Sequence, residues 1–194
     1  MSNPFKDILS NVSFLKGGGA PNAVGIDIGS SAIKVVEIKK KGGKAVLETY
    51  GSISLGPYGD TEIGRITNLT EDKIIEALKE VLKQSGTTTP SSALSIPVQS
   101  SLIFTLELPT EINEGDMDTI VTTEARKYIP VPITEVSVDY FPLPAKEPNY
   151  EESHDPEKAL ATASKREVLV VAIQNDAISR LRSIVDKAGI TANF

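Results

Sequence analysis

The stretch from Val24 to Lys34 constrains the fold of this chain more than any other. An apolar run leads into Asp27, Gly29 and two serines follow, and a second apolar run continues to Ile38. Two apolar runs separated by a short tip that contains glycine are typical of a β-hairpin. We therefore expect a strand, a tight turn and a second strand here.

The expected tip carries groups suited to a phosphate. Gly29 lets the backbone turn sharply and approach a ligand, because glycine has no Cβ. The amides of Gly29, Ser30 and Ser31 would form an anion-binding nest, and the two hydroxyls add donors. Lys34 would bring a point charge to the phosphate. Asp27 would repel a bare phosphate, so it fits best as a ligand, through water, of a hydrated Mg²⁺.

The tip residues alone leave a second interpretation open. Aspartate and serine also favour turns through local hydrogen bonds, so a purely structural hairpin fits equally well. The stretch is not a P-loop, because the Gly-Lys-Ser/Thr ending and the following helix are missing. It is not a dinucleotide-binding fingerprint either, since that motif also needs the helix.

Composition excludes several classes of function. The 194 residues carry a net charge of −6, which argues against nucleic-acid binding and weighs against strong binding to an anionic membrane surface. The absence of cysteine excludes disulfides and thiolate metal sites. No apolar run is long enough to span a bilayer, and no signal peptide is visible. We therefore expect a cytoplasmic protein without a transmembrane segment.

The first half of the chain continues with a strand, a helix and a strand. Residues 45–55 are expected to form a third strand after a lysine-rich turn at 39–44. An amphipathic helix then follows, with Thr70 as its N-cap and Gly86 at its end. A short apolar strand is expected at 93–97.

The second half has the order β-α-β-β-α. A strand at 102–108 precedes a helix from about Asn113, which Pro130 and Pro132 stop. Strands at 136–143 and 165–173 and a final helix at 175–189 complete the pattern.

Two further segments have no clear role. Residues 1–22 contain a short apolar helical pattern and a glycine link. We expect this segment to pack on its own domain or to lie disordered, and a helix that touches a membrane or binds a partner is the alternative. Residues 145–164 are charged and are expected to form a mobile hairpin loop. The loop contains His154, the chain's only histidine, and nothing in the sequence fixes it as a metal ligand or base.

Three stretches resemble a known family. The hairpin from Gly25 to Glu37 is similar to the first phosphate motif of the actin/Hsp70/sugar-kinase superfamily: Asp-x-Gly-Ser/Thr with a basic residue seven positions after the Asp. Within that superfamily, Glu124-x-x-x-Tyr-Ile-Pro-x-Pro132 followed by Asp139-Tyr140, and the strand 166–173 with its helix, resemble the PilM family of FtsA-like type IV pilus assembly proteins. The resemblance runs from about Ala23 to the C-terminus.

The resemblance implies an α/β fold of two subdomains. An incomplete actin-like (ribonuclease H-like) subdomain 1A is expected at 23–99, and an FtsA-type subdomain 1C at 100–189. Residues 190–194 would begin the return to 1A. The second phosphate loop, the adenosine pocket and the second lobe would follow, so we expect unpaired strand edges, possible self-association and weak or no ATP binding by this chain alone.

The resemblance also implies function. ATP and Mg²⁺ would bind at Asp27, Gly29, Ser30, Ser31 and Lys34, with little or no ATPase activity. The cytoplasmic N-terminal tail of the inner-membrane protein PilN would bind beside 1C and link the protein indirectly to the pilus motor ATPases. Our candidate for that groove is the corner formed by Tyr128, Ile129, Pro130, Val131 and Pro132, although a helix stop packed on its own domain fits as well. An FtsA-like division protein and an ATP-dependent sugar or acyl kinase remain alternatives.

Overall fold

The computed structural model describes residues 22–144 and 165–192. The expected N-terminal helix and the charged loop with His154 lie outside these residues. The chain divides into two compact units, one of residues 1–97 and 179–194 and the other of residues 98–178.

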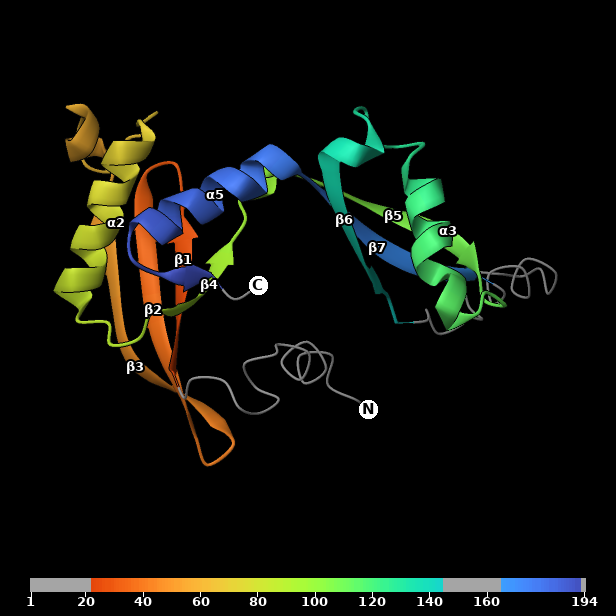
Figure 1. The fold of residues 1–194 in the computed structure, drawn as a ribbon, viewed down its shortest axis with the longest axis horizontal. Helices are drawn as coiled ribbons and strands as arrows, with labels where there is room; N and C mark the ends of the chain where they lie inside the picture. Colours follow the sequence, from red (N-terminus) through yellow and green to blue (C-terminus); the bar gives the residue numbers. More distant parts are fainter. Residues whose placement is uncertain (1–21, 145–164, 193–194) are drawn as a thin grey trace, which may run out of the picture. The chain divides into compact units, whose positions relative to one another are not determined.

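The first unit is built on a five-stranded sheet with the order β3-β2-β1-β4-β8 (Figure 1). The predicted hairpin is confirmed, since β1 pairs with β2 in antiparallel register and β2 pairs with β3 in the same manner. The strands β4 and β8 add in parallel on the other side of β1. The elements are β1 (Asn22–Ile28), β2 (Ala32–Lys41), β3 (Lys44–Ser54), the 3₁₀ turn η2 (Gly56–Gly59), α2 (Glu71–Ser85), β4 (Ser91–Ser95) and β8 (Thr191–Ala192).

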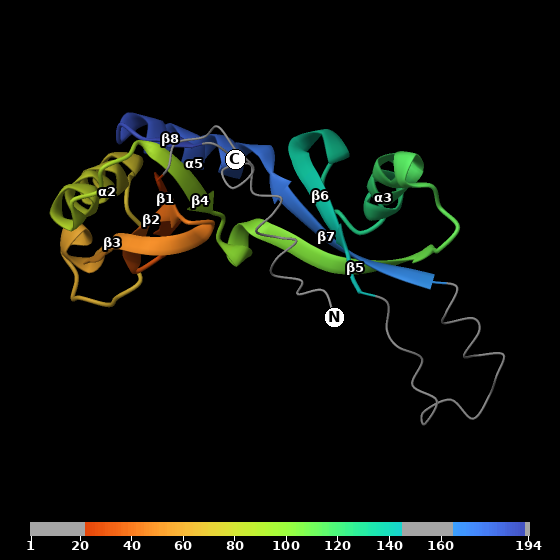
Figure 2. The ribbon, with the colours of Figure 1, turned by 90° about the horizontal axis from the view of Figure 1, so that it is seen from below.

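One face of this sheet forms the core of the first unit. Alternate residues of β1 and β2 point to the same face, which α2 and part of α5 (Asn175–Lys187) cover (Figure 2). Helix α2 begins after Thr70, as predicted, but the Thr70 side chain makes no capping hydrogen bond. Ion pairs from Arg180 (3.2 Å) and Lys187 (3.8 Å) to Glu71 join α5 to the first turn of α2. The buried core includes Val24, Ile26, Ile28, Ile33, Val35, Leu78, Val81, Ile184 and Val185.

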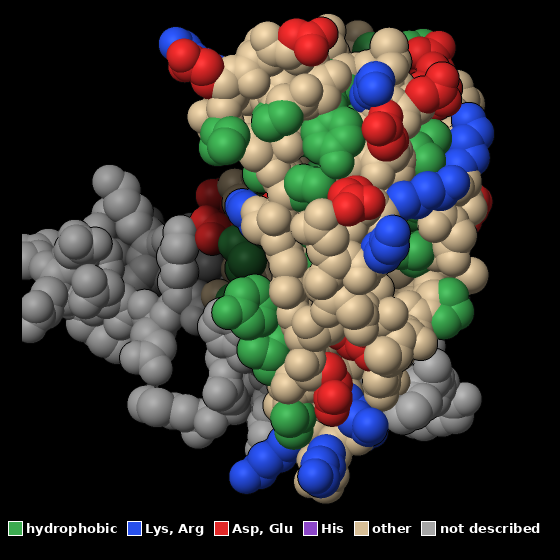
Figure 3. Space-filling model, turned by 90° about the vertical axis from the view of Figure 1, so that its left-hand side faces the viewer, with side chains coloured by type: hydrophobic (Ala, Val, Ile, Leu, Met, Phe, Trp, Pro, Cys, Tyr) green, Lys and Arg blue, Asp and Glu red, His purple; other side chains and the backbone are tan. Residues whose placement is uncertain are grey.

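The hairpin of β2 and β3 extends below the other elements of the first unit in Figure 1. Its two turn residues, Gly42 and Gly43, have φ values of 59° and 77°. Positive φ at both positions is the requirement of a type I′ turn, which matches the twist of the paired strands. Lysine side chains gather at this end of the unit, the lowest part of Figure 3.

The second unit is a three-stranded antiparallel sheet with the order β5-β7-β6 and one helix. Helix α3 packs on one face, where buried side chains from β5 and β7 meet it. The elements are η3 (Val98–Ser100), β5 (Ser101–Pro109), η4 (Glu114–Asp116), α3 (Met117–Ala125), η5 (Ile133–Glu135), β6 (Val136–Pro142) and β7 (Lys165–Gln174). The buried core is Leu106, Leu108, Met117, Val121, Ala125, Ile129, Val168, Val170 and Ala172.

The last helix differs from its expected place. The sequence pattern assigned residues 175–189 to the second subdomain, whereas residues from 179 onward belong to the first unit. The reason is that Ile184 and Val185 of α5 are buried in the core of the first unit. An amphipathic helix is placed by the apolar surface that accepts its stripe, which a local pattern does not identify.

Candidate functional site

The tip of the β1–β2 hairpin is closed by one of the amides expected to bind a ligand. The Gly29 amide donates to the Ala32 carbonyl at 3.0 Å. The expected nest of three amides is therefore wrong for Gly29, because the hydrogen bond that closes the turn already uses the Gly29 amide. The turn also brings the backbone close together, because a Cβ added at Gly29 would lie 3.1 Å from the Ala32 carbonyl oxygen.

The two serines of the tip are held through their carbonyl groups. Leu55 donates its amide to the Ser31 carbonyl at 2.8 Å, and Thr67 donates its amide to the Ser30 carbonyl at 3.0 Å. In a trans peptide the C=O and the next N–H point in opposite directions, so the Ser31 amide faces away from Thr67. Within the described residues, neither the amides nor the hydroxyls of Ser30 and Ser31 donate a hydrogen bond. These four donors can serve an anion.

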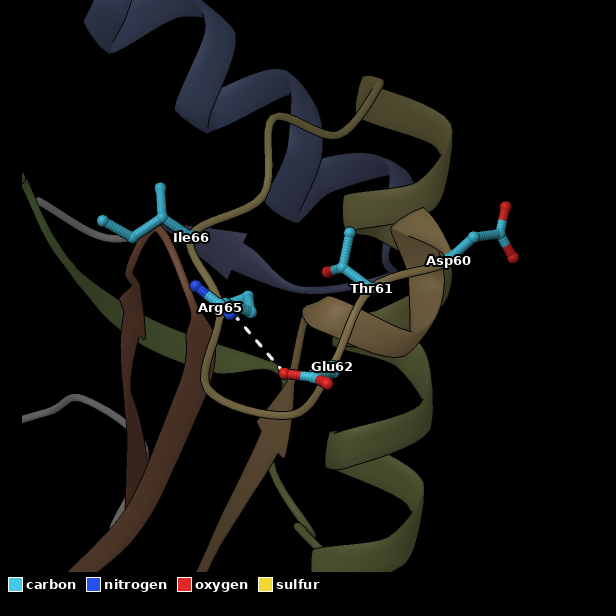
Figure 4. A pocket seen from close by; sticks show the side chains of 5 residues that line it. All are labelled: Asp60, Thr61, Glu62, Arg65 and Ile66. Atoms are coloured by element: carbon cyan, nitrogen blue, oxygen red, sulfur yellow. Dashed lines mark ion pairs between the residues drawn. The ribbon is translucent and has the colours of Figure 1, made fainter.

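The segment 60–67 braces the tip, a role that the sequence did not indicate. Besides the Thr67 bond, Gly64 donates its amide to Ser54 Oγ at 3.2 Å, and this hydroxyl donates to the Ser31 carbonyl at 3.5 Å. Figure 4 shows the segment, in which Arg65 and Glu62 form an ion pair of 3.6 Å. It has no periodic pattern, so only its tertiary contacts reveal the role.

Asp27 is held from two sides. Ser95 donates its hydroxyl to Asp27 Oδ1 at 2.8 Å, and Lys34 Nζ lies 3.6 Å from Asp27 Oδ2. The side chains of Lys34 and Asp27 are 67% and 48% exposed, so their ion pair contributes little to stability and Lys34 can turn to another anion at low cost. The sequence did not identify Ser95, but its register opposite Asp27 on the parallel strand β4 explains the contact.

The donor set of the tip fits a phosphate-bearing ligand with a hydrated cation. Two amides and two hydroxyls lack described acceptors, and Lys34 is available beside them. No cluster of three or more metal-binding side chains occurs in residues 22–144 and 165–192.

A groove in the second unit contains part of the predicted partner corner. Its volume is about 240 Å³, and it lies where β5 and β6 begin and β7 ends. Six of its ten lining residues are apolar, and the other four are two glutamines and two serines. The lining residues are Gln99, Ser100, Ser101, Leu102, Ile129, Pro130, Val131, Val136, Ala172 and Gln174.

The five residues of the predicted corner have different environments. Ile129, Pro130 and Val131 line the groove, whereas Tyr128 and Pro132 do not. Ile129 also belongs to the core at 8% exposure, so the corner packs on its own unit and borders the groove at the same time. Tyr128 is 57% exposed and stacks on Phe104, with ring centroids 5.2 Å apart.

Asn175, the first residue of α5, joins this helix to one side of the groove through its side chain. Its Nδ2 donates to the Thr134 carbonyl at 3.0 Å, and Ser137 donates its hydroxyl to Asn175 Oδ1 at 2.8 Å. These bonds hold the start of β6, which includes the groove residue Val136, against the first turn of α5. The groove wall is therefore fixed by tertiary hydrogen bonds.

The model of the type IV pilus assembly protein PilM family matches residues 25–194. This chain belongs to the PilM family. A solved PilM–PilN type IV pilus biogenesis complex is similar, with a TM-score of 0.65 and 24% identity, over 89% of this chain and 46% of that one.

A second solved structure extends the comparison of the fold. The cytoplasmic domain of EpsL, an inner-membrane component of the type II secretion system of Vibrio cholerae, matches with a TM-score of 0.51 and 8% identity, over 89% of this chain and 55% of that one. The expected actin-like α/β fold is thus confirmed. The chain spans about half the length of these PilM and EpsL structures. No helix in the described residues is long and apolar enough to cross a bilayer.

Proposed function

We propose that this PilM-family protein is a nucleotide-binding scaffold of the type IV pilus machinery that holds the cytoplasmic N-terminal tail of a PilN-like protein. The observation that supports partner binding is the groove in the second unit, whose wall contains Ile129, Pro130 and Val131. The likeness to a PilM protein solved in complex with PilN supports the choice of partner.

The groove has the composition of a peptide site. Leu102, Pro130 and Val131 offer apolar contacts, and the side-chain amides of Gln99 and Gln174 can pair with a peptide backbone. Apolar pockets set the register of a bound segment, while polar groups at the margin orient its main chain. A tail with alternating apolar side chains is therefore the expected occupant.

Calorimetric titration with the N-terminal tail peptide of the PilN-like protein from the same genome tests this proposal. Leu102→Asp places a charge in the groove and is expected to weaken binding at least about ten-fold, roughly 1.4 kcal/mol. Ile103→Asp is the matched control, because Ile103 is the next residue of β5, is 46% exposed and does not line the groove. Equal losses in the two variants would contradict binding in this groove.

We further propose that ATP binds at the hairpin tip with Mg²⁺. Ser30 and Ser31 would donate amides and hydroxyls to phosphate oxygens, Lys34 would exchange Asp27 for a phosphate, and Asp27 would accept hydrogen bonds from water on the cation. Mg²⁺ would neutralise phosphate charge while it keeps several waters. Support comes from the uncommitted donors and the weak Lys34–Asp27 pair.

Nucleotide binding is tested by titration of the protein at its natural full length with ATP and Mg²⁺. Lys34→Ala is expected to weaken binding about ten-fold or more through loss of a charge-assisted bond. Lys44→Ala, which removes an exposed lysine at the far end of the β2–β3 hairpin, is the control. Unchanged affinity in Lys34→Ala would place the nucleotide elsewhere.

The protein would lie in the cytoplasm at the inner membrane through its partner, link indirectly to the motor ATPases and associate with itself. Hydrolysis of ATP would be slow or absent. Family membership favours this role over a division protein or a sugar or acyl kinase.

A further inference from the structure

Three polar side chains form a row across neighbouring strands beside the hairpin tip. Asp27 of β1 lies opposite Lys34 of β2 on one side and opposite Ser95 of β4 on the other. Directly paired residues point to the same face of a sheet, so the three side chains share one face. The preceding residues Ile26 and Leu94 point to the opposite face, where they are buried in the core.

The two oxygens of the Asp27 carboxylate have different partners. Oδ1 accepts the Ser95 hydroxyl at 2.8 Å, whereas Oδ2 lies 3.6 Å from Lys34 Nζ. The ion pair with Lys34 is exposed and therefore weak, so a phosphate can replace Asp27 as the partner of Lys34. When Lys34 turns to a phosphate, Oδ2 loses its partner while Oδ1 keeps Ser95.

The strand that carries Ser95 holds it in place. Ser95 is the last residue of β4, which pairs with β1 in parallel register up to Asp27 itself. Leu94 anchors this end of β4 in the core, and Ser92 donates its hydroxyl to the Thr191 carbonyl at 3.1 Å. The χ2 angle of an aspartate is broad when nothing restrains it, so a donor on a fixed strand selects one orientation of the carboxylate.

The pairing of β1 with β4 does not depend on this hydrogen bond. The backbone ladder and the buried side chains of Ile26 and Leu94 already join the two strands. Both groups of the bond lie on the exposed side of the sheet, where water would satisfy them in its absence. The main consequence of the bond is therefore the orientation of Asp27.

We infer that Ser95 is a positioning residue for the cation of the nucleotide site. By holding Oδ1, it leaves Oδ2 to accept a hydrogen bond from a water of the nucleotide-bound Mg²⁺. The inference rests on the proposed ATP site at the hairpin tip. Waters on Mg²⁺ have fixed directions because the ion demands near-octahedral geometry, so the orientation of their acceptor matters.

Titration calorimetry of the protein at its natural full length tests this role, with ATP and Mg²⁺ and again with ATP and EDTA. The ratio of the two affinities measures how much the cation adds to binding. Ser95→Ala is expected to lower this ratio about ten-fold and to leave the affinity in EDTA within about two-fold, because loss of an orienting partner weakens the metal site. Ser95→Thr keeps the hydroxyl on a strand that tolerates β-branched residues, and should hold the ratio within about three-fold.

Ser52→Ala is the matched control. Ser52 of β3 lies opposite Lys34 on the far side of the row, so it is an exposed serine two strands from Asp27, roughly 10 Å away. Its removal should leave the ratio unchanged.

A double variant separates positioning from a general structural effect. In the Asp27→Asn background, Ser95→Ala should lower the ratio no further, because Ser95 acts only through the carboxylate. A second loss of the same size in this background would contradict action through Asp27.

The outcomes distinguish this inference from the proposal on which it rests. If the natural protein binds ATP more tightly with Mg²⁺ and Ser95→Ala keeps the same ratio, the ATP site stands and the role of Ser95 is wrong. Equal losses of affinity with Mg²⁺ and with EDTA would also overturn it, since Ser95 would then support the fold of the tip. If the natural protein binds no ATP under either condition, the proposed nucleotide site fails and the inference fails with it.

Discussion

Glu37 shows how one residue joins distant parts of the first unit. It is 1% exposed, and its carboxylate accepts bonds from Asn22 Nδ2 (2.8 Å), the Thr88 amide (2.7 Å) and Thr88 Oγ1 (2.6 Å). Burial raises the pKa of Glu37, but the bonds from Thr88 and Asn22 and the charge of Lys39 outweigh it and lower the pKa overall. A buried charge with this many donors is stable as a carboxylate.

The lowered pKa of Glu37 predicts a stability that depends on pH. The contribution of Glu37 is complete above its unfolded value of about 4.5 and is lost as the pH falls through the lower folded pKa. Glu37→Gln leaves donors unpaired and should lower the free energy of unfolding by about 1–3 kcal/mol at neutral pH. As the pH falls, the variant should lose less stability than the natural protein, because it has no carboxylate at this position to protonate. Urea unfolding across this range measures both effects. Glu48→Gln, on the exposed bulge of β3, is the control and should leave stability at neutral pH unchanged.

At the scale of elements, the segment after β3 supports the hairpin tip. A Cβ at Gly56 would collide with the Glu62 carbonyl, so the start of this segment packs too closely for a side chain. Because Leu55 and Thr67 donate to Ser31 and Ser30, a shift of the segment changes how the serine amides are presented. The segment 60–67 and the candidate phosphate site are thus coupled through these hydrogen bonds.

Gly56→Ala is expected to displace the segment and to destabilise the protein by about 1–3 kcal/mol through overpacking. Amide exchange at Leu55 and Thr67 should accelerate, and ATP binding should weaken without any change in the donors themselves. Gly115→Ala is the control, since a Cβ there meets no atom within 4 Å. If amide exchange at Thr67 is unchanged in Gly56→Ala, the segment 60–67 does not hold the serines of the tip as described.

At the scale of the whole molecule, the described chain has two separate cores. One includes Ile184 of α5, and the other is formed by β5, β7 and α3. Helix α5 follows directly after β7 of the second unit yet completes the core of the first. Stability is therefore expected to differ between the units, because each buries its own apolar surface.

Ile184→Ala tests this separation. Removal of a side chain that is 1% exposed should cost about 2–5 kcal/mol in the first unit. Hydrogen exchange should accelerate in β1 and β2 while β5 and β7 keep their protection. Leu106→Ala, in the other core, should give the reverse pattern. Loss of protection in both units from either variant would mean that they unfold together.

Local patterns in the sequence predicted most of the elements. Apolar runs identified β1, β2 and β7, alternating apolar residues identified β5, and an apolar stripe at helical spacing identified α2 and α5, because these patterns depend only on neighbours along the chain. The helix at α3 was expected to run from about Asn113 to Pro130, whereas α3 covers only Met117–Ala125.

The hairpin, its phosphate-suited residues and the family could all be predicted from the sequence. The tertiary structure was needed to show that the Gly29 amide closes the turn, that Ser95 and Lys34 hold Asp27, and that Gly64 and Thr67 brace the serines. It was also needed to show which corner residues line a groove. Most of these contacts join residues far apart in the chain, and their geometry follows from strand register and core packing, which no local pattern encodes.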